Sequence, residues 1–326
     1  MIGEARTNVT VTGLGVHVPD RVVSNDELSQ HVETSDEWIR ERTGIRERRM
    51  AAPEEALSDV SLPAARDALA QAGIEGKDVD LLIVATVTPD MAFPSTAALL
   101  ADELGATQAA AYDLSAGCTG FVYALAQAYG MVATGLSRRA LVVGGDLLSR
   151  ILDWKDRSTL VLFGDGAGAV VLEPAADPGF LGFELGADGG GGESLWLPGS
   201  GSRVFENPDR YVKMNGREVF KFATRVLVQS AIDVLERCGA SVDDVDVYVP
   251  HQANVRIIDY AAKKLGFPQE KVVINVDRYG NTSSGSIPLA LADAVEDGRL
   301  RAGQLVLMTG MGAGLTWGSA LMRWSI

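Results

Sequence analysis

Cysteine and long apolar runs are scarce in this sequence, and each scarcity excludes a class of protein. Only two cysteines occur among 326 residues, with no CxxC spacing, so neither a disulfide framework nor a cysteine zinc site is expected. We therefore expect a reducing, cytoplasmic environment and no metal site. No apolar stretch is long enough to span a bilayer, and the first residues, MIGEARTNVTVTG, lack the basic start and apolar run of a signal peptide.

Positive charge is also in short supply. The 29 basic residues are outnumbered by 43 acidic ones, which gives a net charge of −14. Binding to nucleic acid needs lysine and arginine to neutralise phosphates, so we expect no nucleic-acid partner. The remaining composition, 47% hydrophobic with 36 glycines, is typical of an α/β protein, and 326 residues suffice for one large domain or two fused halves.

The chain contains two echoes of itself. In the first, ALAQAGIEGKDVDLLIVAT (68–86) resembles VLERCGASVDDVDVYVPHQ (234–252) at a constant spacing, the one that separates Gly73 from Gly239. In the second, GLSRRALVVGG (135–145) resembles RLRAGQLVLMTG (299–310) at a slightly shorter spacing, the one that separates Leu136 from Leu300. In the first echo an amphipathic helix ends at glycine, and a short acidic turn leads into a buried strand. We expect two duplicated α/β halves, residues 1–175 and 176–326.

The repeat brings three reactive residue types together. In α/β folds, ligands gather at the carboxyl ends of the strands. Under the spacing of the second echo, Cys118 corresponds to Thr282, which follows Asn281, while His251 follows the strand that matches LIVA in the first half. We therefore expect Cys118, His251 and Asn281 at strand-to-helix turns on one side of the molecule.

Cys118 lies in DLSAGCTGFVYALAQA (113–128), where small residues give way to an apolar helix pattern. A thiol at a helix N-terminus faces unpaired N–H groups and the positive end of the helix dipole, which favours the thiolate. The small neighbours leave room for a substrate carbonyl and leave the Cys118 N–H free for an oxyanion. The segment alone fits a small buried hydrophobic residue about equally well, and Cys238, which precedes Gly239, is assigned that structural role.

His251 is the histidine with a functional setting. His17 and His31 are assigned to surface or turn positions, whereas His251 stands where an apolar strand gives way to a helix. Imidazole can donate a hydrogen bond or shuttle a proton near neutral pH. Asn281, in YGNTSSGSIP, is by itself a turn former, and the hydroxyl residues after it could cap the next helix. Only the repeat makes Asn281 a candidate for the site.

Several long motifs follow one another along nearly the whole chain: TSDEWIRERTGIRERR, SAGCTGFVYAL, LVLFGDGAGAVVLEP, VPHQANVRII, YGNTSSGSIPLAL and LTWGSALMRW. Together they resemble the β-ketoacyl-acyl carrier protein synthase III family of the thiolase-like superfamily. The resemblance implies a five-layered αβαβα fold, a homodimer, and a catalytic triad of Cys118, His251 and Asn281.

The resemblance also implies an acyl-transfer reaction. Cys118 would take an acyl group from acyl-CoA as a thioester, and malonyl-acyl carrier protein would then bind and lose carbon dioxide. His251 and Asn281 would hydrogen-bond the malonyl thioester oxygen as the enolate develops. The enolate would attack the acyl-cysteine, whose oxyanion would be held by the N–H groups of Cys118 and Ala313. Acyl-CoA and malonyl-acyl carrier protein are then substrates, no cofactor stays bound, and the 3-ketoacyl product initiates fatty-acid synthesis.

The contacts with coenzyme A follow from the same resemblance. Trp38 would stack on adenine with Arg157 on its other side, and Arg42 would meet phosphate oxygens. Gly216 and Phe220 would line the pantetheine tunnel. Without the resemblance, Trp38 would be interpreted as a half-buried aromatic anchor.

The carrier protein and the primer involve two further groups of residues. The acidic carrier protein would meet a basic face supplied by Lys221, Arg256, Lys263 and Lys264, each of which taken singly fits a solvated helix surface. Phe93, in TPDMAFPSTA, would reach across the dimer interface to cap the partner's acyl pocket, or else only anchor the interface. A bulky ring there implies short primers, acetyl or small branched, with Met311 able to reshape the same pocket.

The sequence departs from the family pattern at Gly117, where many relatives have alanine, at Arg217, and in MGAGL (311–315). These departures bear on the choice of primer rather than on the reaction type. A priming ketosynthase or acyltransferase of a specialised polyketide pathway is the alternative function. From a different class, a Cys–His–Asn hydrolase uses the same residue types, but the duplicated α/β pattern and the Trp38–Arg157 pair argue against it.

Overall fold

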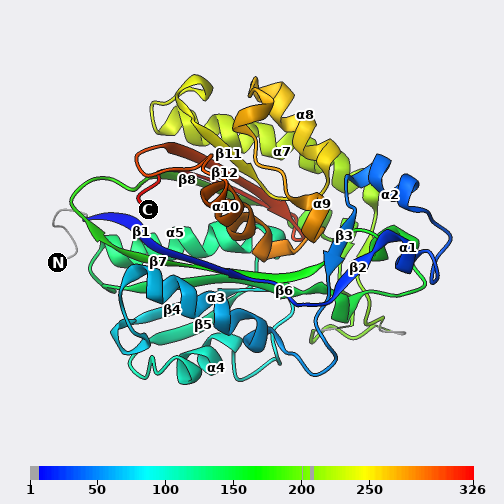
Figure 1. The fold of residues 1–326 in the computed structure, drawn as a ribbon, viewed down its shortest axis with the longest axis horizontal. Coiled ribbons are helices and arrows are strands. Elements are labelled where there is room, and N and C mark those ends of the chain that lie inside the picture. Colours follow the sequence, from blue (N-terminus) through cyan, green and yellow to red (C-terminus); the bar gives the residue numbers. More distant parts are fainter. Residues whose placement is uncertain (1–6, 200, 206–208) are drawn as a thin grey trace.

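The computed structural model describes residues 7–199, 201–205 and 209–326, and these residues form five layers (Figure 1). Two β-sheets alternate with three layers of helices. The outer layers and the middle layer each contain a pair of main helices: α3 (Leu57–Ala72) with α4 (Thr96–Glu103), α7 (Gly216–Arg237) with α8 (Val255–Leu265), and, between the sheets, α5 (Gly120–Ala133) with α10 (Ser286–Glu296). The predicted α/β fold with αβαβα layering is confirmed.

Both sheets mix parallel and antiparallel strands. The first has the order β1-β7-β6-β4-β5, built from β1 (Asn8–His17), β4 (Leu81–Ala85), β5 (Ala110–Leu114), β6 (Ala140–Leu147) and β7 (Asp165–Ala175). The second has the order β11-β12-β13-β8, built from β8 (Phe180–Ala187), β11 (Val247–Pro250), β12 (Leu305–Gly312) and β13 (Thr316–Arg323). In each sheet the parallel pairs lie at one end, β6-β4-β5 and β12-β11, so their carboxyl ends share an edge.

The two sheets have matching strand orders. From the edge inwards, β1-β7-β6-β4 of the first sheet corresponds to β8-β13-β12-β11 of the second. In the first sheet β5 lies outside β4. In the corresponding place outside β11, Val272 forms a parallel bridge with Tyr248 of β11. Because β7 ends at Ala175 and β8 begins at Phe180, we propose that the boundary between the halves, residues 1–175 and 176–326, lies in this connection.

The core follows from strands that are apolar on both faces. Along β4, Leu81, Ile83 and Ala85 pack towards the middle helices, whereas Leu82 and Val84 pack against the outer helices α3 and α4. All five side chains are fully buried. Strands covered on both faces need such continuous apolar runs, which explains why LLIVA could be recognised as a buried strand.

The structure corrects one correspondence drawn from the repeat. A short 3₁₀ turn precedes each middle helix, Gly117–Thr119 before α5 and Ser283–Gly285 before α10, and these turns keep the spacing of the first echo. Cys118 therefore corresponds to Ser284 rather than to Thr282. The shorter spacing of the second echo begins only after the helices, because α5 has 14 residues and α10 has 11.

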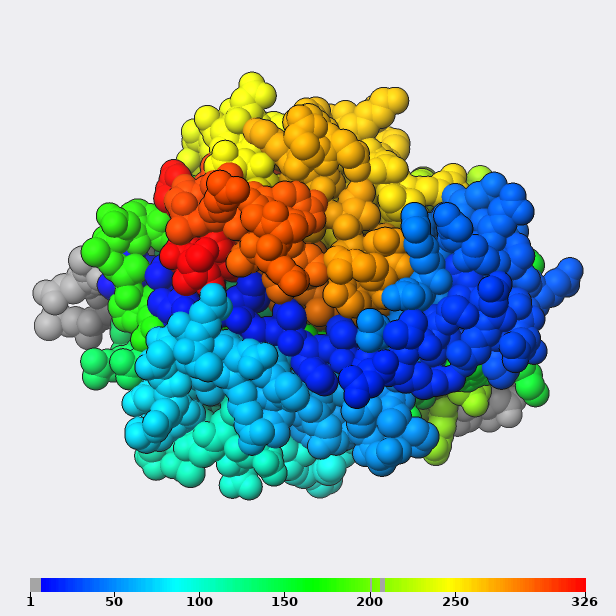
Figure 2. Space-filling view, viewed as in Figure 1, coloured from blue at the N-terminus to red at the C-terminus, as the bar shows by residue number. Residues whose placement is uncertain are grey.

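The smaller elements gather at one end of the molecule, on the right of Figure 1. They are β2 (Val22–Ser24), α1 (Asn25–Leu28), α2 (Asp36–Thr43), β3 (Glu47–Arg49), α6 (Arg157–Leu160), β9 (Leu195–Trp196), β10 (Lys213–Met214) and α9 (Val276–Tyr279). In Figure 2 the blue N-terminal segment lies directly against the orange segment that contains α9. Backbone hydrogen bonding joins them, from the Arg46 N–H to the Asp277 carbonyl at 2.9 Å. In the described ranges no helix is long and apolar enough to cross a membrane.

Candidate active site

Cys118 stands in the 3₁₀ turn between β5 and α5, and it is 7% exposed. The backbone is crowded there: a Cβ on Gly117 would lie 2.6 Å from the Ala313 carbonyl oxygen, and a Cβ on Gly312 would lie 2.4 Å from the Cys118 nitrogen. Gly117 also has a φ of 57°, which favours glycine. These two glycines let the end of β12 approach the cysteine, so that the Ala313 N–H reaches the thiol.

Hydroxyl groups hold two consecutive carbonyls at the start of this turn. The Ser284 hydroxyl donates to the Gly117 carbonyl at 3.1 Å, and the Thr316 hydroxyl is 2.8 Å from the Ala116 carbonyl oxygen. The Cys118 N–H belongs to the same peptide group as the Gly117 carbonyl and points the opposite way. Fixing that carbonyl therefore fixes the direction of the N–H group that the sequence predicts for the oxyanion.

The expectation that the helix N-terminus favours the Cys118 thiolate is wrong for this structure. Burial, reinforced by the Asp146 carboxylate, raises the pKa of the Cys118 thiol from 9.0 to about 11. Hydrogen bonding from the Ser283 side chain and from the N–H groups of Cys118 and Ala313 acts in the opposite direction but does not overcome burial. The sequence shows the start of the helix but not how deeply Cys118 is buried. Burial has the larger effect on the pKa of the thiol.

His251 follows β11 and is 1% exposed. Its backbone N–H donates to the Thr309 carbonyl at 2.7 Å, and its Nδ1 lies 2.7 Å from the Ser286 hydroxyl. Burial lowers the pKa of His251 from 6.5 to about 3, so the imidazole is neutral at physiological pH. Its Nε2 is buried and has no hydrogen-bond partner within the described residues. A neutral imidazole with one unpartnered ring nitrogen is suited to donate or accept a hydrogen bond rather than to carry charge.

Asn281 is held from both sides of its backbone. Its N–H donates to the Leu162 carbonyl at 2.9 Å, and its carbonyl accepts from the Gly164 N–H at 3.0 Å. Its side-chain Oδ1 accepts from the Ser283 N–H at 2.9 Å, so the amide NH₂ is the end left for a ligand. The following hydroxyl residues do not cap α10 as the sequence suggested: its N-cap is Gly285, without a side-chain hydrogen bond, because the 3₁₀ turn satisfies the backbone instead.

Two cavities meet at Cys118. One, of about 150 Å³, is lined by Cys118, His251 and Asn281 together with Met311, Gly216 and Phe220. The other, of about 260 Å³, is lined by Cys118, Gly117 and Ala313 and then by mostly apolar side chains: Val87, Leu148, Ile151, Leu152, Phe163, Leu195, Trp196, Leu197 and Val212. The predicted convergence of the three reactive residues is thus present, with an apolar chamber beside the same sulfur.

Trp38 lies on α2 between two guanidinium groups. Arg42 Cζ is 4.8 Å and Arg157 Cζ is 4.9 Å from the centroid of the Trp38 ring. Helix α2 is attached to the start of α8, because the Asn254 side-chain amide donates to the Arg42 carbonyl at 3.0 Å. Asn254 also lines the cavity that holds His251. Three of the five predicted coenzyme A contacts, Trp38, Arg42 and Arg157, therefore form one cluster, which Asn254 connects to the lining of that cavity.

The residues predicted to bind the carrier protein and to shape the acyl pocket are exposed on the surface, with the exception of Met311. Lys221, Arg256, Lys263 and Lys264 are exposed on α7 and α8, and Arg256 Cζ is 5.8 Å from the centroid of the Phe220 ring. Phe93 is 85% exposed on the loop between β4 and α4. The exception is Met311, which is buried and lines the cavity shared with His251 and Asn281 rather than the apolar chamber.

Sequence reasoning did not identify three residues that shape this site. Ser283 has a φ of 51°, unusual for serine, and lines the apolar chamber beside Cys118. Ser286 contacts the His251 ring, and Thr316 holds the turn before Cys118. For Ser283 and Ser286 the only signal was the density of hydroxyl residues in NTSSGS, which is equally typical of a turn, and Thr316 lies outside that stretch.

Comparisons with known proteins agree with this arrangement. The family described as 3-oxoacyl-[acyl-carrier-protein (ACP)] synthase III matches residues 112–189, and its C-terminal counterpart matches residues 235–324. A β-ketoacyl-[acyl-carrier-protein] synthase III of Symbiobacterium thermophilum is 55% identical over 323 residues, 97% of this chain and 98% of the relative.

Solved structures of the same kind superpose closely. The β-ketoacyl-[acyl carrier protein] synthase III of Thermus thermophilus has a TM-score of 0.93 at 48% identity, covering 97% of this chain and 99% of that one. The priming β-ketosynthase from the R1128 polyketide biosynthetic pathway has a TM-score of 0.94 at 39% identity, covering 100% of this chain and 98% of that one.

Proposed function

This chain belongs to the β-ketoacyl-acyl carrier protein synthase III family and is an acyltransferase of that type, and from this premise we propose the following reaction. The enzyme condenses a short acyl-CoA with malonyl-acyl carrier protein, gives 3-ketoacyl-acyl carrier protein and carbon dioxide, and so initiates fatty-acid synthesis. The observation that carries the proposal is the position of Cys118 at the junction of two cavities, one apolar and one lined by His251 and Asn281.

In the first half-reaction, the Cys118 sulfur attacks the carbonyl carbon of acyl-CoA. A carbon–sulfur bond forms to Cys118, the bond to CoA breaks, and the thiol proton leaves with the CoA thiolate. The N–H groups of Cys118 and Ala313 stabilise the oxyanion of the tetrahedral intermediate. The apolar chamber takes the acyl chain, because apolar lining favours burial of its methylene groups.

In the second half-reaction, the malonyl thioester oxygen accepts hydrogen bonds from His251 and Asn281. The bond to the carboxylate breaks, carbon dioxide leaves, and its electron pair forms an enolate. The enolate carbon attacks the acyl-Cys118 carbonyl, a carbon–carbon bond forms, and the Cys118 thiolate departs and takes up one proton from solvent. Neutral donors suit this step because they stabilise developing negative charge in a dry site without themselves being ionised. The His251 pKa of about 3 agrees with that role.

The Trp38 cluster is the proposed site of coenzyme A. Two guanidinium groups beside a half-buried indole can bind an adenine by stacking and phosphates by ion pairing. In the free enzyme Arg42 already contacts the Trp38 ring, so adenine stacks on whichever face an arginine vacates. The pantetheine arm then follows Gly216 and Phe220 into the cavity that ends at Cys118.

The proposed docking surface for acyl carrier protein consists of the exposed cations Lys221, Arg256, Lys263 and Lys264. Arg256 lies over Phe220 at the cavity that holds His251, so a carrier protein bound there could place its arm in the same tunnel. A local basic surface is compatible with a net charge of −14, because charges separated by more than about 8 Å are largely screened at physiological salt.

A homodimer is the proposed assembly. Strand β5 is the outermost strand of its sheet, and its free edge pairs with no strand in the described part of the chain. Phe93, on the loop between β4 and α4, exposes 85% of its surface, which is costly for an aromatic side chain in water. Pairing of two copies through this side of the molecule would cover Phe93 and bring it to the partner's acyl chamber.

A priming ketosynthase of a polyketide pathway is the second candidate, because the R1128 priming enzyme superposes over the whole chain. The two candidates share their chemistry and differ in primer and carrier protein. Acetyl and small branched primers are proposed here, since Phe93 would close the chamber to longer chains.

The test is an incubation of the enzyme with a panel of acyl-CoA primers and malonyl-acyl carrier protein. The proposal predicts carbon dioxide and 3-ketoacyl-acyl carrier protein with short primers, and none with the Cys118→Ser variant. Release of free fatty acid without carbon dioxide would instead indicate a hydrolase and would overturn the proposal. Exclusive use of primers of twelve carbons would overturn the primer assignment alone.

A further inference from the structure

Ser286 opens helix α10, is 1% exposed, and touches two groups with its hydroxyl. The Oγ accepts from the Gln252 N–H at 2.9 Å and lies 2.7 Å from His251 Nδ1. Ser286 itself lines neither of the two cavities that meet at Cys118. Its contacts nevertheless decide a property on which the proposed second half-reaction depends, namely which nitrogen of His251 carries the proton.

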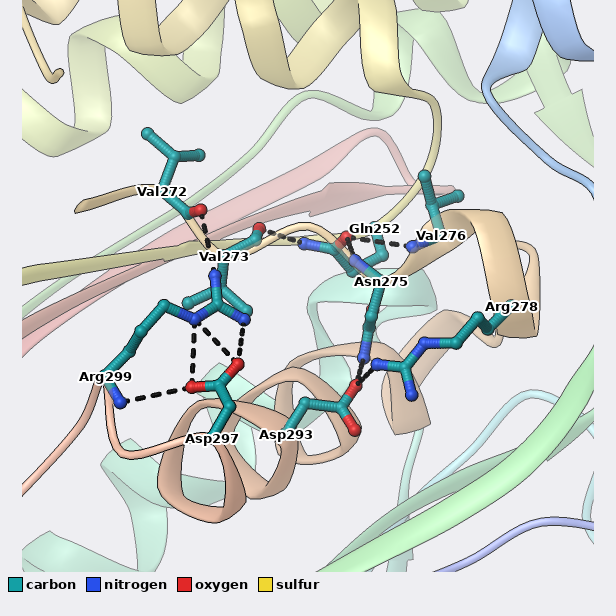
Figure 3. A network of polar contacts seen from close by, with 9 residues as sticks. All are labelled: Gln252, Val272, Val273, Asn275, Val276, Arg278, Asp293, Asp297 and Arg299. Carbon is teal, nitrogen blue, oxygen red and sulfur yellow. Dashed lines mark hydrogen bonds and ion pairs between the residues drawn. The ribbon is translucent and has the colours of Figure 1, made fainter. Parts of the chain in front are cut away.

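The donor on one side of Ser286 is rigidly held. The Gln252 side chain is clamped at both ends. Its Nε2 donates to the Val273 carbonyl at 3.0 Å and its Oε1 accepts from the Asn275 N–H at 2.9 Å (Figure 3). Its Nε2 also donates to the Pro250 carbonyl at 2.8 Å. Gln252 is also buried, and its backbone N–H donates to Ser286. One acceptor position of the Ser286 hydroxyl is therefore permanently filled.

The helix that carries Ser286 is anchored to the same segment. Asp293 of α10 accepts from the Asn275 side-chain amide at 2.6 Å and from Arg278 at 2.7 Å, and both bonds appear in Figure 3. Gln252 and Asp293 thus bind opposite ends of the Asn275 residue, its backbone and its side chain. This network fixes the distance between α10 and the turn of His251, and so preserves the contact between Ser286 and the imidazole.

The hydroxyl has one proton, and its placement distinguishes the two tautomers of His251. If Nδ1 carried the imidazole proton, Ser286 would accept twice, and its own hydrogen would have no acceptor among the described residues. If Nδ1 is unprotonated, Ser286 accepts from Gln252 and donates to Nδ1, and the one group left unpartnered is the Nε2–H of His251, which lines the cavity. The first arrangement would leave two groups unpartnered, the Ser286 hydrogen and Nε2. Because each buried polar group without a partner costs free energy, the second arrangement prevails.

We propose that Ser286 is a positioning residue that holds His251 in the tautomer with its proton on Nε2. The unpartnered Nε2 then presents an N–H donor to the cavity that also contains Cys118 and Asn281. With the other tautomer Nε2 would be an acceptor and would repel the oxygen of a developing enolate. This inference rests on the proposed function for its catalytic consequence, but the tautomer itself is a property of the free enzyme.

Nitrogen-15 NMR of the histidine side chains tests the tautomer directly. The chain has three histidines, so single substitutions of His17 and His31 assign the His251 signals. The wild type is expected to show an Nε2-protonated ring, and Ser286→Ala a mixture of both tautomers. Ser286→Thr retains the hydroxyl and is expected to restore the single tautomer. An Nδ1-protonated ring in the wild type, or an unchanged tautomer in Ser286→Ala, would overturn the proposal.

The activity measurements separate positioning from general damage. Ser286→Ala is expected to lower condensation by at least about tenfold, below the ~10²–10³-fold loss on removing a donor outright, while acylation of Cys118 stays near wild type. Ser286→Thr is expected to recover condensation. Ser61→Ala is the matched control, because Ser61 is a fully buried helical serine remote from the site, and it should leave both half-reactions unchanged.

The outcomes distinguish this inference from the proposed function. Lost condensation in Ser286→Ala with an unaltered tautomer would contradict the positioning role. A wild type that showed the Nε2-protonated ring but released no carbon dioxide from malonyl-acyl carrier protein would contradict the proposed function and leave the tautomer assignment standing.

Discussion

The free Cys118 thiol can be titrated through its reaction with an alkylating reagent. Its pKa is raised from 9.0 to about 11 by burial, so we predict a slow, steeply pH-dependent reaction with a small uncharged alkylating reagent such as iodoacetamide. The perturbation is simply a change of pH from 7 to 9.5, with no mutation at the site.

The magnitude follows from the fraction of thiolate. At pH 8 a thiol of pKa 9.0 is about one-tenth ionised, whereas a thiol of pKa about 11 is about one-thousandth ionised. Alkylation of Cys118 should therefore be about 100-fold slower than that of an unperturbed cysteine. Its rate should also rise about tenfold for each pH unit up to pH 9.5, without levelling off.

The assay is intact-mass measurement of the alkylated fraction over time. A Cys238→Ser background leaves Cys118 as the only thiol, and the Cys118→Ser variant sets the baseline. The unfolded protein at each pH supplies the reference for an accessible cysteine. A rate that levels off below pH 8 would show a preformed thiolate, and it would refute the conclusion that burial outweighs the helix dipole at this position.

The catalytic and binding residues allow four further tests. His251→Ala and Asn281→Ala should each retain acylation of Cys118, followed by intact mass, but lose about 10²–10³-fold in carbon dioxide release; loss of acylation with decarboxylation intact would reverse the assigned roles. Because the His251 pKa falls from 6.5 to about 3, its contribution to stability is present above pH 6.5 and is lost as pH falls towards 3. Between pH 6.5 and pH 5 the free energy of unfolding, measured with urea, should therefore fall by about 2 kcal/mol more in the wild type than in His251→Gln. Equal losses would contradict the lowered pKa of His251. Trp38→Ala should raise the KM for acyl-CoA while leaving the KM for malonyl-acyl carrier protein near wild type, and an effect on the second substrate alone would contradict its role. Phe93→Thr should extend the accepted primer length without dissociating the proposed dimer, as measured by product analysis and sedimentation, whereas an unchanged primer range would contradict the proposed role of Phe93 in the acyl chamber.

The layout of the fold could be predicted from the sequence because its signals are local. Strands such as LLIVA are apolar at every position, which is typical of sheets covered on both faces, and glycine marks the end of the helix in each copy of the repeat. The repeat brought Cys118 and His251 together without any structure. It failed only in the detail of Ser284, because a repeat at constant spacing cannot show where a helix has been shortened.

The electrostatics of the site could not be predicted in the same way. The pKa of Cys118 depends on how completely the surrounding layers exclude water, and that depth is set by residues far away in the sequence. Ser286 was missed for a related reason. Its contact with His251 joins residues 35 positions apart, and nothing local to NTSSGS distinguishes a hydroxyl that meets an imidazole from one that stabilises a turn.

The most direct test of the central claim is a single turnover of isolated acetyl-Cys118 enzyme mixed with malonyl-acyl carrier protein. We expect the acetyl adduct to disappear with release of one carbon dioxide and formation of one 3-ketoacyl-acyl carrier protein for each adduct consumed. Loss of the adduct as free acetate, with malonyl-acyl carrier protein unchanged, would contradict the central claim.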